Sequence, residues 1–281
     1  MSQKSYNKTP ILYLIPTPIG NMDDITLRAI KILEEVTVIF SEDTRVTAML
    51  LNHLKIKKKL IANHEHNENQ NKVKLLEHLE KGDNVGLVSD RGTPIISDPG
   101  YGLALHAIEN GYNVVALPGP TALIPALITS GLSPMPFLFY GFLNSKDGKR
   151  KKELETLNKE KATLIFYEAP HRLTKTLQTM LKTMGNRKIS ISREISKKFE
   201  EVYRGMLLDV INETLNVKGE IVIVLDGNHL DNQYNDLTII EHVNLYIKEG
   251  HSNMESIKLV AKERSINKNQ VYNEYHEISK E

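Results

Sequence analysis

The side chains best suited to chemistry lie in five short polar segments, each directly after an apolar run and most containing glycine or proline. The segments are P-T-P-I-G-N (16–21), S-E-D-T-R (41–45), H-E-H-N (64–67), S-D-R-G-T-P (89–94) and P-G-P-T-A (118–122). Carboxylates and imidazoles can accept a proton, and backbone groups at glycine turns can hold a polar ligand. A single glycine such as Gly20, Gly92 or Gly119 need only serve a tight turn. The coincidence of five segments is what indicates a ligand site.

The apolar runs alternate with helical patterns, an order typical of a parallel sheet with crossover helices. Strands are predicted at 11–15, 36–41, 60–62, 85–89 and 114–117, and in a second series at 137–140, 163–167, 189–192, 202–204 and 221–225. Helices such as 25–35 and 72–81 separate them. Because ligands of open α/β sheets bind at the carboxyl ends of the strands, the five segments should meet at one edge of the first sheet.

Residues that interrupt secondary structure predict three domains in an α/β protein. Pro118, Gly119 and Pro120 interrupt the chain after the fifth strand, so the first α/β domain is placed at 1–119 and the second at 120–228. The polar stretch 226–236 is typical of a linker. Two or three short helices without a strand pattern follow, which predicts a small helical domain at 237–281.

The composition excludes several kinds of chemistry. The sequence has no Cys, which rules out disulfides, thiolate nucleophiles and zinc sites that need sulfur. No G-x-x-x-x-G-K-[ST] loop occurs, and the G-x-G at 100–102 lacks the third glycine of a dinucleotide-binding loop. A metal bound by His64, Glu65 and His66 is the less favoured hypothesis, because an H-E-x-x-H helix is absent. We expect no metal.

Charge and hydropathy point to a soluble cytoplasmic protein with no membrane partner. The 281 residues are 40% hydrophobic, enough for a sizeable core, and the net charge is +1. The apolar run 11–15 is far shorter than the roughly 20 residues of a membrane span. Basic side chains nevertheless gather at 55–59, 146–152 and 187–198, and each run nets +4. Such runs are usually solvated faces, but three of them fit phosphate contacts.

The five segments, followed by F-Y-E-A-P-H-R (166–172) and S-R-E-I-S-K-K-F-E (192–200), closely resemble the ribosomal RNA small subunit methyltransferase I family. This family belongs to the tetrapyrrole methylase superfamily, and the resemblance runs from about Leu12 to Gly227. It implies two consecutive α/β domains with S-adenosylmethionine in the cleft between them, and a homodimer. It also implies methyl transfer to the ribose 2′-hydroxyl of a cytidine in the decoding region of 16S rRNA, on the small ribosomal subunit.

Carried over position by position, the resemblance assigns the cofactor to Pro18, Asp90, Gly92, Thr93, Thr121, Ala122 and Tyr167. Without the motif, Asp90 is equally suited to capping the turn that follows it. One position departs from the family pattern, because Arg91 stands where a small residue, commonly Ala, is usual. Its guanidinium could contact a cofactor carboxylate or an RNA phosphate, or it could point outward.

A ribose hydroxyl is a poor nucleophile until its proton begins to leave, so a carboxylate or imidazole near it would help. The catalytic candidates are Glu168, Glu42, His64 and Glu194. The candidates for RNA phosphates are Arg45, Lys149, Arg150, Lys151, Lys152, Arg172, Arg193 and Lys197. In the plainer interpretation, Asp43 or Thr44 caps a helix and Arg45 lies on a solvated face.

Two other functions remain open at this point. One is methylation of a precorrin-like tetrapyrrole, against which the H-E-H-N and Y-E-A-P-H-R segments and the basic runs argue. The other is a ribosome-assembly protein that holds RNA without turnover. Cofactor binding by the isolated protein separates a binder from an enzyme, and mass mapping of ribosomal RNA identifies the substrate class.

Overall fold

The structure is a computed structural model, and it describes residues 3–5, 9–64, 66–214, 217–229, 237–264 and 266–277. Glu65 and most of the expected linker, 230–236, lie outside the described residues. The chain divides into two compact units: Met1–Thr156 with Thr163–Asp226, and Leu157–Ala162 with Gly227–Glu281. Both sheets belong to the first unit, so the limits 1–119 and 120–228 stay predictions.

The first sheet is parallel throughout, as its alternating pattern predicts. It consists of β1 (Ile11–Leu14), β2 (Val38–Ser41), β3 (Lys59–Ala62), β4 (Val85–Val88) and β5 (Asn113–Ala116). The spatial order is β3-β2-β4-β1-β5, and every neighbouring pair is parallel. All five carboxyl ends therefore lie at one edge, where the five polar segments begin.

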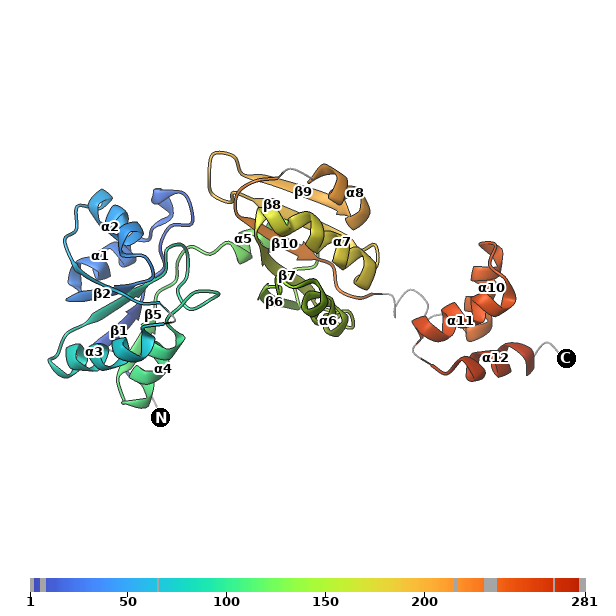
Figure 1. Ribbon diagram of the computed structural model, residues 1–281, viewed down its shortest axis with the longest axis horizontal. Coiled ribbons are helices and arrows are strands. Elements are labelled where there is room, and N and C mark those ends of the chain that lie inside the picture. Colours follow the sequence, from blue (N-terminus) through green and yellow to red (C-terminus); the bar gives the residue numbers. More distant parts are fainter. Residues whose placement is uncertain are drawn as a thin grey trace. The chain divides into compact units, whose positions relative to one another are not determined.

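Helices cover both faces of this sheet (Figure 1). Side chains alternate along β2, so that Phe40 packs in one cluster and Ile39 in the other. The Ile39 face is covered by α1 (Leu27–Glu35) and α2 (Thr44–His53), and the Phe40 face by α3 (Glu68–Glu80) and α4 (Tyr101–Glu109). Because the connections from β1 and β4 leave on opposite faces, a crevice opens between these neighbouring strands, where α/β proteins bind ligands.

The second sheet differs from the expected parallel arrangement. It contains β6 (Phe137–Phe142), β7 (Thr163–Glu168), β8 (Lys188–Arg193), β9 (Glu201–Met206) and β10 (Ile221–Leu225), in the order β6-β7-β10-β8-β9. Only β6 and β7 pair in parallel, whereas β10 is antiparallel to both β7 and β8, and β9 is antiparallel to β8. The helices of this part are α5 (Leu123–Thr129), α6 (Asp147–Leu157), α7 (Leu173–Met184) and α8 (Leu207–Glu213). The short connection 194–200 makes β8 and β9 a hairpin, which requires antiparallel pairing.

The carboxyl-terminal helices form a small core of their own. They are α10 (Ile239–Lys248), α11 (Asn253–Glu263) and α12 (Lys268–Glu277), and Val243, Val260 and Val271 are fully buried among them. Thr238 and Ser252 begin α10 and α11 with capping boxes, in which cap and third-residue carboxylate bond reciprocally. No helix in the described part of the chain is long and apolar enough to cross a membrane.

Gly119 lets the segments after β1 and β5 pack closely together, because a Cβ atom there would lie 2.7 Å from Cβ of Pro16. We expect Gly119→Ala to lower the free energy of unfolding by about 1 to 3 kcal/mol, the usual cost of overpacking a tight contact. Urea unfolding measures the change. Gly148→Ala is the matched control, since an added Cβ there meets nothing within 4 Å. Equal stabilities of the two variants would contradict the close approach.

Candidate functional site

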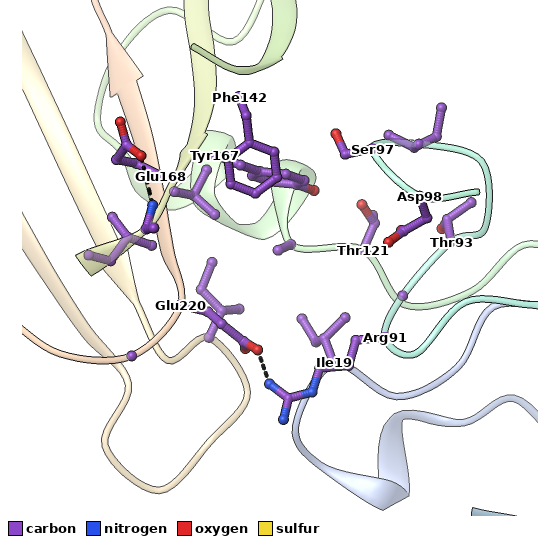
Figure 2. A pocket seen from close by; sticks show the side chains of 18 of the residues that line it. Ile19, Arg91, Thr93, Ser97, Asp98, Thr121, Phe142, Tyr167, Glu168 and Glu220 are labelled. Atoms are coloured by element: carbon purple, nitrogen blue, oxygen red, sulfur yellow. Dashed lines mark hydrogen bonds and ion pairs between the residues drawn. The ribbon is translucent and has the colours of Figure 1, made fainter. Parts of the chain in front are cut away.

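A cavity of about 370 Å³ lies at the carboxyl ends of the first sheet's strands (Figure 2). One wall comes from the segments after β1, β4 and β5, with Ile19, residues 91–93 and 96–98, and residues 121–122. The facing wall comes from the second sheet and its loops, including Phe142, Tyr167, Glu220 and Val222. We call this space the donor cavity. Its lining combines aliphatic and aromatic side chains with a few polar groups, the usual composition of a small-molecule site.

The loop between β4 and α4 is held in an unusual backbone conformation. Thr17 and Gly92 exchange two backbone hydrogen bonds of 2.9 Å, which tie this loop to the segment after β1. Gly92 has a φ of 79°, and the non-glycine residues Ile95 and Ser97 have φ values of 79° and 66°. A β-branched residue at positive φ is a genuine outlier, and such strain gathers at ligand sites. The loop therefore presents fixed groups to the cavity.

Tyr167 gives the facing wall an aromatic surface. Its ring meets the ring of Phe139 edge-on at 4.9 Å and that of Phe142 at 5.6 Å between centroids. Burial raises the pKa of Tyr167, the largest influence on this phenol, while hydrogen bonds with the Thr121 hydroxyl and the Leu123 backbone lower it. The phenol therefore stays neutral at physiological pH and can act as a hydrogen-bond donor beside an apolar ligand face.

Arg91, the residue that departs from the family pattern, lines the donor cavity and has a partner there. Its guanidinium forms an ion pair with Glu220 across the donor cavity (Figure 2). Glu220 also accepts a hydrogen bond of 2.7 Å from Nζ of Lys197. About half of each side chain of the Arg91–Glu220 pair is exposed, so the pair contributes at most about 1 kcal/mol. The pair contributes little to stability, but both of its residues line the donor cavity.

A second cavity, of about 580 Å³, adjoins the first (we call it the acceptor cavity). It is lined by Glu42, His64, His66, Ile95, Ser97, Asp98 and Pro99. Ser97 and Asp98 line both cavities, which makes them a shared wall. The five polar segments thus serve two adjacent spaces and not one. Within the described residues, no group of three or more His, Asp or Glu side chains is placed to hold a metal ion.

Asp98 was not among the site residues predicted from the sequence, although it follows the S-D-R-G-T-P segment closely, in S-D-P-G (97–100). Desolvation by burial, with additional repulsion from Glu42 and Asp90, raises the pKa of Asp98 to about 7. Burial and the Asp90 charge also raise the pKa of Glu42, which His64 partly opposes. A carboxyl group with a near-neutral pKa in a cavity wall is a recognised mark of a functional site.

Comparison with known proteins identifies the family. Residues 11–211 match the family of tetrapyrrole (corrin/porphyrin) methylases. The ribosomal RNA small subunit methyltransferase I of Bacillus subtilis is 45% identical over 285 residues, covering 98% of this chain and 97% of the relative. The chain belongs to the ribosomal RNA small subunit methyltransferase I family. The protein of the same name from Halalkalibacterium halodurans is 43% identical over 98% of this chain and 99% of its own length. The chain is thus a member of a methyltransferase family.

Solved structures of two other methyltransferases share the fold. The methyltransferase CobJ superposes with a TM-score of 0.60 at 19% identity, over 78% of this chain and 95% of its own. Uroporphyrin III C-methyltransferase from Thermus thermophilus gives a TM-score of 0.52 at 21% identity, over 77% and 97%. At these identities the likeness concerns the fold alone. It confirms the expected architecture of two α/β sheets with helices, and this structure adds the expected carboxyl-terminal helices.

The structure brings together five of the seven cofactor residues that the family resemblance assigned. Gly92, Thr93, Thr121, Ala122 and Tyr167 line the donor cavity. Pro18 is buried and does not line the cavity, whereas the neighbouring Ile19 does.

Asp90 also lies outside the lining, and Oδ1 of Asp90 accepts a hydrogen bond of 2.9 Å from the backbone N–H of Asp43. This bond joins the loops after β2 and β4, and the assignment of Asp90 to the cofactor stays a prediction.

Two of the four catalytic candidates in this methyltransferase have carboxylates that are already engaged. Oε2 of Glu168 accepts a hydrogen bond of 2.5 Å from Thr176, Oε1 accepts one of 2.8 Å from the Ala169 N–H, and the side chain is 1% exposed. Oε1 of Glu194 accepts hydrogen bonds from Lys197 and from the backbone N–H of Glu220. Glu168 nevertheless lines the donor cavity, and the base roles of Glu168 and Glu194 stay predictions. Glu42 and His64, by contrast, face the acceptor cavity together.

The predicted RNA residues separate into exposed and engaged groups. Lys149, Lys151 and Lys152 are exposed on α6. Arg150 is only 2% exposed and bonds to Asp147, Thr179 and the Ser145 carbonyl, so its assignment to an RNA surface is corrected to a structural role.

The remaining four arginine and lysine candidates are paired within the chain. Arg172 bonds to the Leu143 carbonyl, Arg193 to Glu201, and Lys197 to Glu194 and Glu220. Arg45 is largely exposed but forms a bidentate pair with Asp43. Asp43 also caps α2, and its hydrogen bonds to Arg45 lower the pKa of Asp43 to about 2. A phosphate would compete with these partners or bind the N–H groups that they leave unused.

Proposed function

We propose that this methyltransferase uses S-adenosylmethionine to methylate the ribose 2′-hydroxyl of a cytidine in the decoding region of 16S rRNA, on the small ribosomal subunit. The observation that supports it most is the donor cavity, which gathers five residues assigned to the cofactor in a chain of this family. The acceptor cavity beside it offers a separate space for a second substrate. Methyl transfer needs such adjacent spaces, since the two reactants must meet in line.

The residues of the donor cavity fit S-adenosylmethionine. A volume of about 370 Å³ falls in the range of about 300 to 1,000 Å³ that is usual for ligand pockets. Ile19, Tyr167 and Val222 supply apolar surface for a nucleoside, and the Thr93 and Thr121 hydroxyls supply polar contacts. Gly92 has no side chain, which leaves room for a ligand beside the backbone of the β4–α4 loop. When bound, the cofactor supplies an electrophilic methyl group on a positively charged sulfur.

In this proposal the chain's own groups bind the two reactants, orient them and remove the proton of the ribose hydroxyl. The β4–α4 loop holds both reactants, because Ser97 and Asp98 face both cavities. Much of the rate comes from holding the hydroxyl oxygen in line with the methyl carbon. Glu42 and His64 line the space where the ribose would lie, and either could orient its hydroxyls.

The exposed lysines of α6 provide a test of RNA binding. We expect replacement of Lys149, Lys151 and Lys152 by Gln to weaken binding to small ribosomal subunits, because each phosphate contact releases counterions. The slope of log affinity against log salt concentration should fall by about 0.7 to 0.9 for each phosphate that a lysine no longer neutralises. Fluorescence titration at several salt concentrations measures both. Cofactor affinity should not change.

Arg150→Gln is the matched control for the lysine variants. It removes a positive charge from the same helix, but from a buried side chain. It should lower thermal stability and leave the salt dependence as in the wild type. An unchanged salt slope in the triple lysine variant would show that α6 is only a solvated face and that RNA binds elsewhere.

The proposed activity is tested with purified protein, isotopically labelled S-adenosylmethionine, and small subunits from a strain that lacks the enzyme. The expected product is 16S rRNA carrying one labelled methyl group on a cytidine ribose, located by nuclease digestion and nucleoside mass spectrometry. Methylation of uroporphyrinogen III but not of rRNA would favour a tetrapyrrole substrate. Cofactor binding with no transfer to either substrate would indicate a non-catalytic RNA-binding protein. A homodimer and a cytoplasmic location remain predictions.

A further inference from the structure

We propose that Asp98 is the general base that removes the proton from the attacking hydroxyl, acting from the wall that separates the donor and acceptor cavities. This inference rests on the proposed function and extends it to a residue that none of the motif assignments includes. Three features support it: where Asp98 lies, what its carboxylate lacks, and which charges surround it.

The position of Asp98 is suited to a proton acceptor between two substrates. It lines the donor cavity beside Thr93 and Thr121, and its carboxylate points toward that space (Figure 2). It also lines the acceptor cavity with Glu42 and His64. The backbone around it is fixed, because Ser97 immediately before it and Gly100 two residues after it both have positive φ. A base held in this way needs little reorganisation at the moment of reaction.

The Asp98 carboxylate is not committed to the fold. In the part of the chain that the structure describes, it accepts no hydrogen bond and forms no ion pair. This separates Asp98 from Asp90, Glu168 and Glu194, whose oxygens accept hydrogen bonds from the protein. A half-buried carboxylate without a donor is costly to the fold, so a function is the more economical explanation.

The surrounding charges keep this carboxyl group ready to accept a proton near neutral pH. Burial, Glu42 and Asp90 all disfavour its ionised form, and the pKa of Asp98 rises to about 7. The other titratable groups of the acceptor cavity are His64 and His66, both exposed. On the donor side, the Arg91 guanidinium is paired with Glu220 and is therefore partly neutralised. A base is most effective when its pKa lies close to the working pH.

Charges and atoms balance in the proposed step. The hydroxyl oxygen forms a bond to the methyl carbon as the carbon–sulfur bond breaks, and the sulfur keeps that electron pair and becomes a neutral thioether. The hydroxyl proton passes to a carboxylate oxygen of Asp98. The products are the methyl ether, S-adenosylhomocysteine and protonated Asp98, which returns its proton to solvent through the open acceptor cavity.

The main competing role for Asp98 is a contact with a positively charged group of the cofactor, and the two roles give different results. For a general base, we expect Asp98→Asn to lower the single-turnover rate about 10²- to 10⁴-fold while cofactor affinity changes less than about threefold. For a cofactor contact, affinity and rate fall together, which would overturn the proposal. Asp209→Asn, an exposed carboxylate in the first turn of α8, is the matched control.

The pH dependence is a second test. The wild-type rate should rise about tenfold per pH unit below pH 7 and level off above it, because Asp98 must be ionised to accept a proton. Asp98→Asn should lose this inflection, whereas Asp209→Asn should keep it. A wild-type profile that is flat between pH 5.5 and 8, or the same inflection in the Asp98→Asn variant, would exclude Asp98 as the base.

A third test uses the protein without substrates and so does not depend on the proposed function. Since folding raises the pKa of Asp98, its ionised form is destabilising, and this cost grows as the pH rises from about 4 toward 7. The melting temperature of Asp98→Asn should therefore exceed that of the wild type at pH 8 by more than at pH 5. Carbon-13 NMR of labelled aspartates should show one resonance, absent from the variant, that titrates near pH 7. A titration below pH 5 would overturn the inference even if rRNA methylation is confirmed.

Discussion

Thr121→Trp is expected to weaken the binding of S-adenosylmethionine at least about 100-fold while the protein stays folded, a change of about 2.7 kcal/mol. Thr121 follows β5 and, like Asp98, it lines the donor cavity (Figure 2). An indole ring in that place would occupy much of a cavity of about 370 Å³. Thr121 is only half-buried, so the larger side chain enters the cavity and does not disrupt the core.

Isothermal titration calorimetry measures the affinity of this variant, and thermal unfolding confirms that it is folded. Thr121→Ser is the matched control, because it keeps the hydroxyl group that bonds to Tyr167 and adds no volume. It should bind the cofactor within a fewfold of the wild type. If Thr121→Trp binds as well as Thr121→Ser, the cofactor does not occupy the donor cavity, and the space lined by Glu42 and His64 becomes the alternative.

Much of the fold could be predicted from the sequence because strands that are buried on both faces give unbroken apolar runs. Val85–Val88 and Ile221–Leu225 are of this kind, and every residue of both strands is buried. The same property gives no information on strand direction, since an all-apolar run such as β10 has the same pattern in parallel and antiparallel pairing. The mixed second sheet therefore could not be predicted from apolar runs alone.

The directions of two predicted site residues follow from the periods of the elements that carry them. Glu168 is adjacent to Tyr167 on β7, and successive side chains of a strand point to opposite faces. Tyr167 and Glu168 both line the donor cavity, but the Glu168 carboxylate accepts a hydrogen bond from Thr176 on α7. Arg150 stands four residues before the buried Leu154 on α6 and shares its inner face. Applying these periodicities to polar residues would have predicted both positions.

Asp98 could not be found in this way, because its unusual environment arises from groups that are distant in the sequence. The loop after β2 contributes Glu42, and burial depends on how the β4–α4 loop folds over the strand ends. A motif gives the residue types at such a site, but desolvation and charge repulsion depend on the assembled structure.

The second large effect is expected when the substrate, and not the protein, is changed. A small subunit reconstituted with a single 2′-deoxycytidine at the target position should accept no methyl group, whereas its binding should change little. The 2′-hydroxyl is the proposed nucleophile, and most of the affinity for RNA comes from phosphate contacts that this change leaves in place. Binding is measured by fluorescence titration at fixed salt concentration, with the all-ribose subunit as the control.

Methyl transfer to this deoxy-substituted subunit is the measurement that tests the account most directly. It is carried out under single-turnover conditions with saturating S-adenosylmethionine, and nucleoside mass spectrometry then locates the label. We predict one methyl group on the cytidine ribose of the all-ribose subunit and none on the deoxy-substituted subunit that binds equally well. A methyl group on a base atom, or equal labelling of the two subunits, would contradict ribose methylation by this protein.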